Sequence, residues 1–442
     1  MITDNLPRFT RPSARARTSG WPAAVCAFAL FLATADAKPI LPAGLAGFPA
    51  AGPTAESDRA STDNSDDLPL GAPQFDTTPV PLPPNAASLG HEAAATSEFG
   101  DLVRLSGAAH FIDSVTVTLS TSAIRSDYAG SSPFGFTHPV TLKLYSVDRT
   151  GAAPRAGAVI ATLQHAFLIP WRPEPHATST APSRPWRAAN GKYYSGLAFN
   201  LTFDLGALGL TLPDEVIFGV SFNTHHYGDT PIGVAGPYDR LGVVVASAPP
   251  VPGVDIDTDA VFWRTANAAA YTDGGAAGVN VFRSDTGWTP YTPAIRFTNS
   301  AYGTLADTAA ALRTLHSGER TIDFALSDAA TLLSFALPRG FWDGHNRLQL
   351  DGGGPVFELI AEAAQELATV AATRDAHAAE ARRLLTPLLG AAQSLAETAL
   401  GDAIIAGGDA RRISRSQDAL DRAQANVSAS EAVKAVDAYN AA

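Results

Sequence analysis

Residues 254–297 read VDIDTDAVFWRTANAAAYTDGGAAGVNVFRSDTGWTPYTPAIRF. The expected secondary structure changes from strands to helices just after this stretch. Its last part, TPYTPAIRF at 289–297, has the pattern of the final strand of an antiparallel sheet. Pro290 and Pro293 cannot donate ladder hydrogen bonds, so we expect residues 289–293 at the edge or margin of the sheet. The residues before the stretch read as earlier strands, and those after Tyr302 read as helices.

The part of the chain before this stretch alternates apolar and polar residues with a period of two. Residues 197–204 (LAFNLTFD) give the clearest alternation, and Val115, Val117 and Leu119 alternate with serine and threonine in the same way. Similar segments recur at 140–145, 159–163, 216–222, 242–246, 260–263 and 294–297. About eight strands separated by turn residues predict an antiparallel jelly-roll-like β-sandwich. The long connections at 164–196 and 224–240 are the places where we expect function.

After Tyr302 the apolar residues recur with the helical period of 3.6. Leu305, Ala309 and Leu312 begin such a stripe, and further helices are predicted at about 355–385, 387–406, 409–426 and 430–441. Thr386 is the expected N-cap of the second of these, with Pro387 at its first position. The pattern predicts an α-helical bundle over residues 303–442.

The N-terminus predicts the compartment. Four arginines precede the apolar run WPAAVCAFALFLAT at 21–34, and Ala35-Asp36-Ala37 fits a signal-peptidase site. We therefore expect a signal peptide at 1–37, a disordered Pro/Ala-rich linker at 38–84, and the sandwich at 85–300. A retained N-terminal anchor is the alternative. The mature protein has no second apolar run of membrane-spanning length, so we expect it to be secreted.

Charge and cysteine content narrow the classes of partner. Removal of residues 1–37, which carry four arginines and two aspartates, would shift the net charge from −12 to −14. Nucleic acids and anionic lipids are bound through lysine and arginine, so neither is an expected partner. Cys26 is the only cysteine and lies in the predicted leader, which excludes disulfides and thiolate metal sites from the mature chain.

Aromatic residues in the loops of the predicted sandwich suggest carbohydrate binding. Sugar rings stack on aromatic faces while polar side chains bind the hydroxyl groups. The candidate ligand-binding residues are Trp171, Trp186, Tyr193, His225, His226, Tyr227, Tyr238, Trp263 and Trp288. Tryptophan in a sandwich is more often partly buried packing, and we expect Trp288 to be chiefly structural beneath the 254–273 segment.

The segment His225-His226-Tyr227-Gly228-Asp229 is the best candidate cluster for a site, because adjacent histidines can ligate zinc or act as a general base. Neighbouring residues in a strand point to opposite faces, so the pair would not easily bind one ion there. We therefore favour loop packing and hydrogen bonding for these two side chains, with metal binding or catalysis as the alternative.

Five aspartates suggest a weak calcium site without any other cofactor: Asp255, Asp257, Asp259, Asp273 and Asp285. The spacing of the first three resembles the opening of an EF-hand loop. The sixth position holds Ala260 in place of glycine and the twelfth holds Ala266 in place of glutamate, so an EF-hand is excluded. A calcium site of another type, near Trp288, is one hypothesis, and solvated loop acids are the other.

No catalytic arrangement stands out. The chain lacks a G-x-S-x-G motif, and glutamates are few within the sandwich. The expected function is therefore a secreted, non-catalytic protein whose sandwich binds an extracellular polymer, for example a glycan, or an envelope component. A secreted hydrolase and a purely structural exoprotein are the alternatives, and the enzyme question stays open.

Several motifs resemble those of an uncharacterised family of exported bacterial β-sandwich proteins. They are SEFGDL at 97–102, IPWRP at 169–173, AFNLTFDL at 198–205, THHYGDTPIGVAGPY at 224–238 and DTGWTPY at 285–291. The resemblance covers roughly residues 79–298 and implies a sandwich. Family members often carry a cysteine pair near 178–194, which this chain lacks. Residues 407–409 and 432–439 are similar to a helical module of secreted actinobacterial-type proteins. Neither resemblance assigns a catalytic residue.

Overall fold

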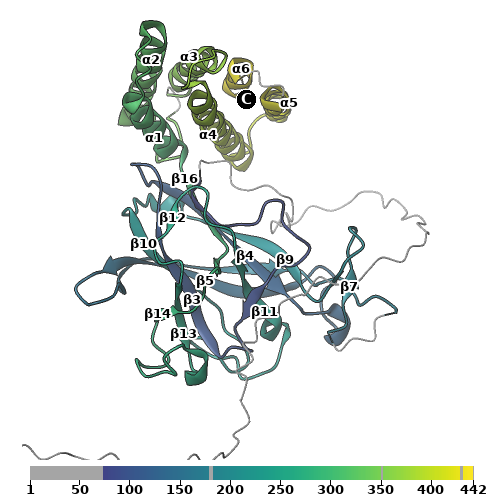
Figure 1. Ribbon diagram of the computed structural model, residues 1–442. Helices are drawn as coiled ribbons and strands as arrows, with labels where there is room; N and C mark the ends of the chain where they lie inside the picture. Colours follow the sequence, from purple (N-terminus) through teal and green to yellow (C-terminus); the bar gives the residue numbers. More distant parts are fainter. Residues whose placement is uncertain (1–72, 179–182, 350–351, 429–431, 442) are drawn as a thin grey trace, which may run out of the picture.

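The computed structural model describes residues 73–178, 183–349, 352–428 and 432–441. Within these residues two seven-stranded antiparallel sheets are followed by six α-helices (Figure 1). The predicted fold class, an antiparallel sandwich followed by a helical bundle, is confirmed. The predicted signal peptide and most of the predicted linker lie outside the described residues.

The first sheet is built around β4 (Ile112–Thr121). Its order is β1-β16-β4-β11-β15, with β2 added beside β11 and β9 beside β4. The bounds are β1 Pro73–Asp76, β2 Ser88–Gly90, β9 Leu197–Asp204, β11 Leu241–Ala246, β15 Thr292–Pro293 and β16 Ile295–Asn299. The two-residue β15 lies at the end of this order, which agrees with the marginal position expected from its prolines.

The second sheet is built around β3 (Thr96–Arg104). Its order is β14-β13-β3-β10-β5-β6, and β12 also pairs with β3. The bounds are β5 Phe136–Asp148, β6 Arg155–Ile169, β10 Glu215–Ser221, β12 Val254–Asp255, β13 Ala260–Thr265 and β14 Arg283–Thr286. A separate small hairpin pairs β7 (Trp186–Arg187) with β8 (Tyr193–Tyr194).

The sandwich core lies between these sheets. Alternate residues point inward, so Phe99 and Val103 of β3, Phe218 of β10 and Phe297 of β16 belong to one buried cluster. Burial of each such side chain contributes about 1.5–3 kcal/mol. Leu102, with its neighbours, forms a separate small cluster on the other face of the second sheet. This outer face carries the polar network described below.

The first sheet begins inside the segment predicted as a linker. β1 pairs with β16, and Phe75 is fully buried against Phe297 with a ring-centroid distance of 6.4 Å. The strand has only four residues and starts with Pro73, so it lacks the alternation that identifies longer strands. A proline is tolerated there because β1 is an edge strand.

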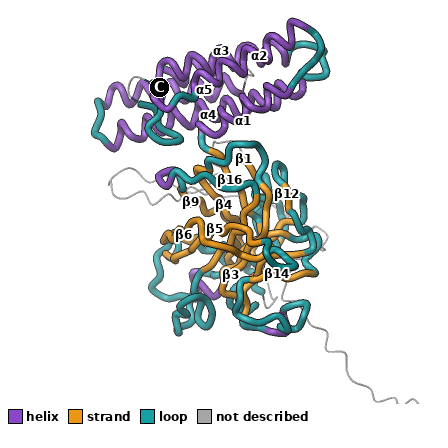
Figure 2. The backbone as a smooth tube through the Cα atoms, turned by 90° about the vertical axis from the view of Figure 1, so that its left-hand side faces the viewer, coloured by secondary structure: helices purple, strands orange, loops and turns teal. Residues whose placement is uncertain are grey.

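The helices lie together on one side of the sandwich, where β16 leads into α1 (Figures 1 and 2). They bury an alanine- and leucine-rich core of their own. Their bounds are α1 Ala301–Thr314, α2 Arg320–Ala336, α3 Gly353–Ala371, α4 Ala378–Ile405, α5 Ala410–Ser428 and α6 Ala432–Asn440. None of the helices that the structure describes is long and apolar enough to cross a bilayer.

The predicted start of a helix at Pro387 is wrong. α4 begins at Ala378 and continues through Pro387, because Leu384 and Leu388 on either side of the proline are both buried. Tertiary packing therefore outweighs the cost of the missing backbone donor. The break comes earlier, where the backbone N–H of His377 donates to Asp375 at 2.8 Å.

Asp307 of α1 connects the bundle to the sandwich. Its Oδ1 accepts the backbone N–H groups of Ala108 and Ala109, both at 2.7 Å. Its Oδ2 accepts the side-chain amides of Gln74 and Asn299, both at 3.0 Å. One carboxylate thus joins the first helix to two sandwich segments and to the end of β16.

Candidate functional site

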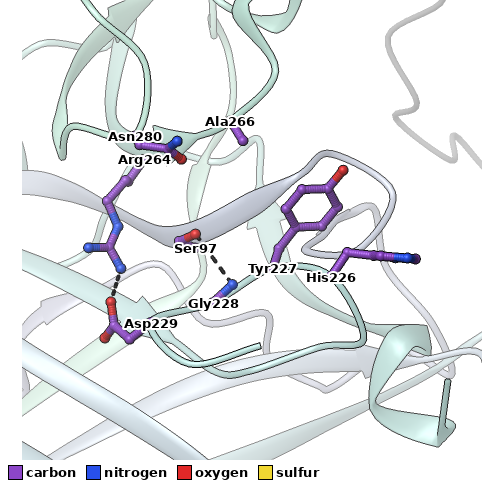
Figure 3. Close-up of a pocket in the computed structure, with 8 residues that line it drawn as sticks. All are labelled: Ser97, His226, Tyr227, Gly228, Asp229, Arg264, Ala266 and Asn280. Atoms are coloured by element: carbon purple, nitrogen blue, oxygen red, sulfur yellow. Dashed lines mark hydrogen bonds and ion pairs between the residues drawn. The ribbon is translucent and has the colours of Figure 1, made fainter. Parts of the chain in front are cut away.

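A polar pocket lies where β3 and β13 meet the loop that follows β10. Its cavity volume is about 370 Å³. The residues that line it are Ser97, His226, Tyr227, Gly228, Asp229, Arg264, Ala266 and Asn280 (Figure 3). In Figure 3 the ring of Tyr227 lies between Ser97 and His226 in the view, while Arg264 and Asp229 point toward one another. The pocket can therefore offer hydrogen-bonding groups beside an aromatic ring.

The loop at 222–236 is held in place by its own polar groups. Thr224 donates its hydroxyl to the carbonyl of Tyr227 at 3.1 Å. Asp239 accepts the N–H of His225 at 2.6 Å and that of Gly236 at 2.9 Å. Gly228 has φ +121°, a conformation that other residues rarely adopt. These contacts fix the backbone that presents the pocket residues 226–229.

A charge network supports the pocket on the outer face of the second sheet. Glu98, 1% exposed, accepts the hydroxyl of Tyr145 at 2.6 Å. Its Oε2 lies 3.6 Å from Lys143 Nζ and 3.9 Å from Arg264 Nε. Lys143 also contacts Asp229 at 3.2 Å, and Arg264 forms a second ion pair with Asp229. Two cations thus balance two carboxylates.

The pKa values reflect this balance. Burial alone would raise the pKa of Asp229, but the contacts with Arg264 and Lys143 lower it below its usual value. Burial and the hydrogen bond to Glu98 raise the pKa of the Tyr145 hydroxyl. At neutral pH Asp229 is therefore charged, and the Tyr145 hydroxyl is a neutral donor.

A second polar cluster lies beside the pocket. Glu92, in the turn at 91–95, comes close to His225 and His226, and one ligand atom from each lies within 4.8 Å of the others. The imidazole of His226 forms a short contact with Glu92, and the backbone N–H of His226 donates to Glu92 at 3.1 Å. The two histidine rings stack with centroids 3.7 Å apart. These two residues lie in a loop and not in a strand, so their side chains do not have to point to opposite faces.

Three of the predicted aromatic ligands lie in the 164–196 connection, outside the pocket lining. Trp171 donates its indole N–H to the Ser132 carbonyl, and Trp186 donates to the Gly196 carbonyl, both at 2.8 Å. Tyr193 is 47% exposed. The predicted set therefore divides between this connection and the pocket loop.

The remaining aromatic candidates serve as packing. Tyr238 stacks on His138 with ring centroids 5.1 Å apart. Trp263 and Trp288 are buried, with centroids 5.3 Å apart and nearly perpendicular rings. Neither indole offers an open face to a ligand. The expected structural position of Trp288 agrees with this burial.

Two of the predicted calcium ligands, Asp285 and Asp259, contact Trp288, and a third, Asp273, does not. Asp285 is buried and accepts the indole N–H of Trp288 at 3.2 Å. The carbonyl of Asp259 accepts the backbone N–H of Trp288 at 3.1 Å. Asp273 pairs instead with Arg283 at 2.9 Å. Each of these acids thus has a partner within the protein.

The other two predicted ligands, Asp255 and Asp257, approach a buried acid that the sequence did not single out. Burial, and then the charges of Asp255 and Asp257, raise the pKa of Asp101 well above its usual value. Asp101 accepts hydrogen bonds from Thr292 and from the N–H of Leu102, both at 2.8 Å. Within the described residues, no three of the five predicted aspartates bring ligand oxygens within 4.8 Å of one another. Calcium binding stays a prediction.

Sequence reasoning did not identify most of the residues that build the pocket and the histidine cluster. Asp229 belongs to the predicted cluster at 225–229, so its position near the histidines could be expected from the sequence. Glu92, Arg264 and Asn280 are far from that motif in sequence, and only strand pairing brings them near it. Their residue types gave no local signal.

Comparison of the chain with models of protein families, with curated proteins and with solved structures gives no match. The resemblance to exported bacterial proteins therefore stays an expectation.

Proposed function

We propose that the chain is an exported, non-catalytic binding protein, and that the pocket at residues 226–229 binds a neutral saccharide of an extracellular polymer. The observation that carries this proposal is the composition of the pocket lining. It combines a tyrosine ring with a guanidinium, a carboxylate, an amide and a hydroxyl. Sugar hydroxyls both donate and accept hydrogen bonds, so this mixture suits them.

The charge balance favours a neutral ligand. Arg264 and Lys143 are each paired with Asp229 and lie near Glu98, so the network offers no uncompensated cation to a phosphate or uronate. The acidic character of the whole chain, with a net charge of −12, also disfavours polyanions.

Affinity electrophoresis in gels that contain soluble neutral glucans, mannans or xylans tests this function. We expect at least one polymer to retard the chain, and Tyr227→Ala and Asn280→Ala each to weaken binding about tenfold, the equivalent of one hydrogen bond or ring contact. Tyr193→Ala is the matched control, because it removes an exposed tyrosine outside the pocket lining. No retardation by any polymer would overturn the proposal, as would loss of binding in Tyr193→Ala but not in the pocket variants.

A secreted hydrolase is the second candidate, and the contact between His226 and Glu92 at the edge of the pocket favours it. A histidine held by a carboxylate is a common general base. Release of new reducing ends from a retarding polymer, abolished by His226→Ala, would establish the hydrolase. Retardation without release agrees with the binding function.

A further inference from the structure

We propose that Glu92, His225 and His226 form a binding site for a divalent transition-metal ion such as Zn²⁺. The inference goes beyond saccharide binding and rests on a different group of atoms. Among the residues that the structure describes, this is the only set of three or more histidine, cysteine or acidic side chains whose ligand atoms converge within 4.8 Å.

The convergence depends on the loop conformation. The rings of His225 and His226 stack at 3.7 Å with 30° between their planes, so consecutive imidazoles face the same region instead of opposite sides. Glu92 approaches from the turn between β2 and β3, 133 and 134 positions earlier in the chain. Two imidazoles and one carboxylate are therefore supplied by two distant segments.

The ligand backbone is already fixed. Asp239 accepts the N–H of His225 at 2.6 Å, and the N–H of Gly233 donates to the His225 carbonyl at 3.0 Å. Glu92 accepts the N–H of His226 at 3.1 Å. A site whose ligands are oriented by such contacts loses little conformational freedom when a metal binds.

The donor set selects the class of metal. Imidazole nitrogen with a carboxylate suits Zn²⁺, Cu²⁺ or Ni²⁺, whereas Ca²⁺ and Mg²⁺ prefer oxygen ligands alone. Three protein ligands leave one tetrahedral position for water. The side chain of His226 is 59% exposed, which provides an entry path. In Figure 3 this side chain points away from Arg264 and Asp229, so the metal would lie at the His226 end of the pocket lining, apart from the ion pair.

Bound metal would tie the 222–236 loop to the 91–95 turn. The loop carries Tyr227 and Asp229, so the ion would fix one wall of the pocket. This arrangement makes metal binding measurable when no saccharide is present, and its outcome is independent of the proposed function.

The test uses the mature chain without an affinity tag, stripped with chelator and titrated with ZnCl₂ by calorimetry, with bound zinc counted by mass spectrometry. We expect one zinc per chain. The double variant His225→Ala/His226→Ala should bind at least about 100-fold more weakly, and Glu92→Gln should also bind more weakly. His316→Ala is the matched control, because it removes an exposed histidine from the loop between α1 and α2.

Two results would overturn the site: equal zinc affinity in the wild type and the double variant, or no zinc bound by the folded wild type at millimolar ZnCl₂. If the double variant does not fold, the site is tested by the zinc affinity of Glu92→Gln and by the visible spectra of the Co²⁺-loaded wild type and Glu92→Gln. Intense tetrahedral d–d bands that Glu92→Gln alters support the site. Weak octahedral bands that are identical in both proteins contradict it.

Discussion

Glu98 and Asp101 are two buried carboxylates on the same strand, β3, and they differ in the sign of the charges around them. Glu98 lies on the outer face, near Lys143 and Arg264. Asp101 lies on the core face, and the nearest charges that act on it are those of Asp255 and Asp257. One carboxylate is balanced by cations, and the other is surrounded by further acids.

The difference shows how this sandwich uses buried charge. The balanced carboxylate supports the polar pocket, because two of its partners, Arg264 directly and Asp229 through the cations, line that pocket. For the unbalanced one, burial and the neighbouring acids disfavour the charged form, which raises its pKa. We infer that the first is built for recognition, and the second joins the sheets through its bond to Thr292 of β15.

The largest effect is expected for Glu98→Ala. The change leaves two cations and the Tyr145 hydroxyl without their buried partner. Loss of one partner of a fully buried pair costs about 3–5 kcal/mol, and we expect about 2–3 kcal/mol here because both cations keep some contact with water. Urea unfolding measures this loss of unfolding free energy. Glu215→Ala, which removes an exposed pair with Arg104 and Arg149, is the control at about 1 kcal/mol or less. Equal losses of unfolding free energy in the two variants would contradict the expected difference between the buried and the exposed carboxylate.

Gly219→Ala should disturb the same carboxylate without removing charge. A Cβ at this position would lie 2.3 Å from Glu98 Oε1, so the glutamate must move, at a cost of about 1–3 kcal/mol. The strain requires the glutamate side chain, and a double-mutant cycle should show that Gly219→Ala costs much less in the Glu98→Ala background. Additive losses would show that the strain lies elsewhere.

A smaller effect of opposite sign is expected for Asp101→Asn. The pKa of Asp101 is raised in the folded protein, so its contribution to stability is fully present below the ordinary pKa near 3.8 and is lost as pH rises through the folded pKa. The amide cannot ionise and can keep both hydrogen bonds. We expect the variant to gain about 1 kcal/mol over the wild type at pH 8 and little at pH 4. Thermal melts at both values measure this. A loss of stability that is the same at both pH values would contradict the assignment.

The sequence predicted periodic features well and contacts between distant segments poorly. Alternation identified strands such as β9, and the change of period near Tyr302 located the start of the bundle. β1 was missed because four residues with a leading proline carry no period, and Pro387 misled because packing of Leu384 and Leu388 holds the helix together. His226 and Tyr227 were singled out from their motif. Glu92 and Arg264 were not, because their role depends on pairing that no local pattern encodes.

The most direct test of a pocket whose cations are already paired is a calorimetric titration of the chain with two matched oligosaccharides, one of neutral hexoses and one of hexuronic acids. The sugars should come from a polymer that retards the chain and from its uronate counterpart. The account predicts that the neutral oligosaccharide binds, and that the uronate binds at least about tenfold more weakly because Arg264 and Lys143 are already paired. Binding of the uronate as tightly as the neutral sugar, or tighter, would contradict it.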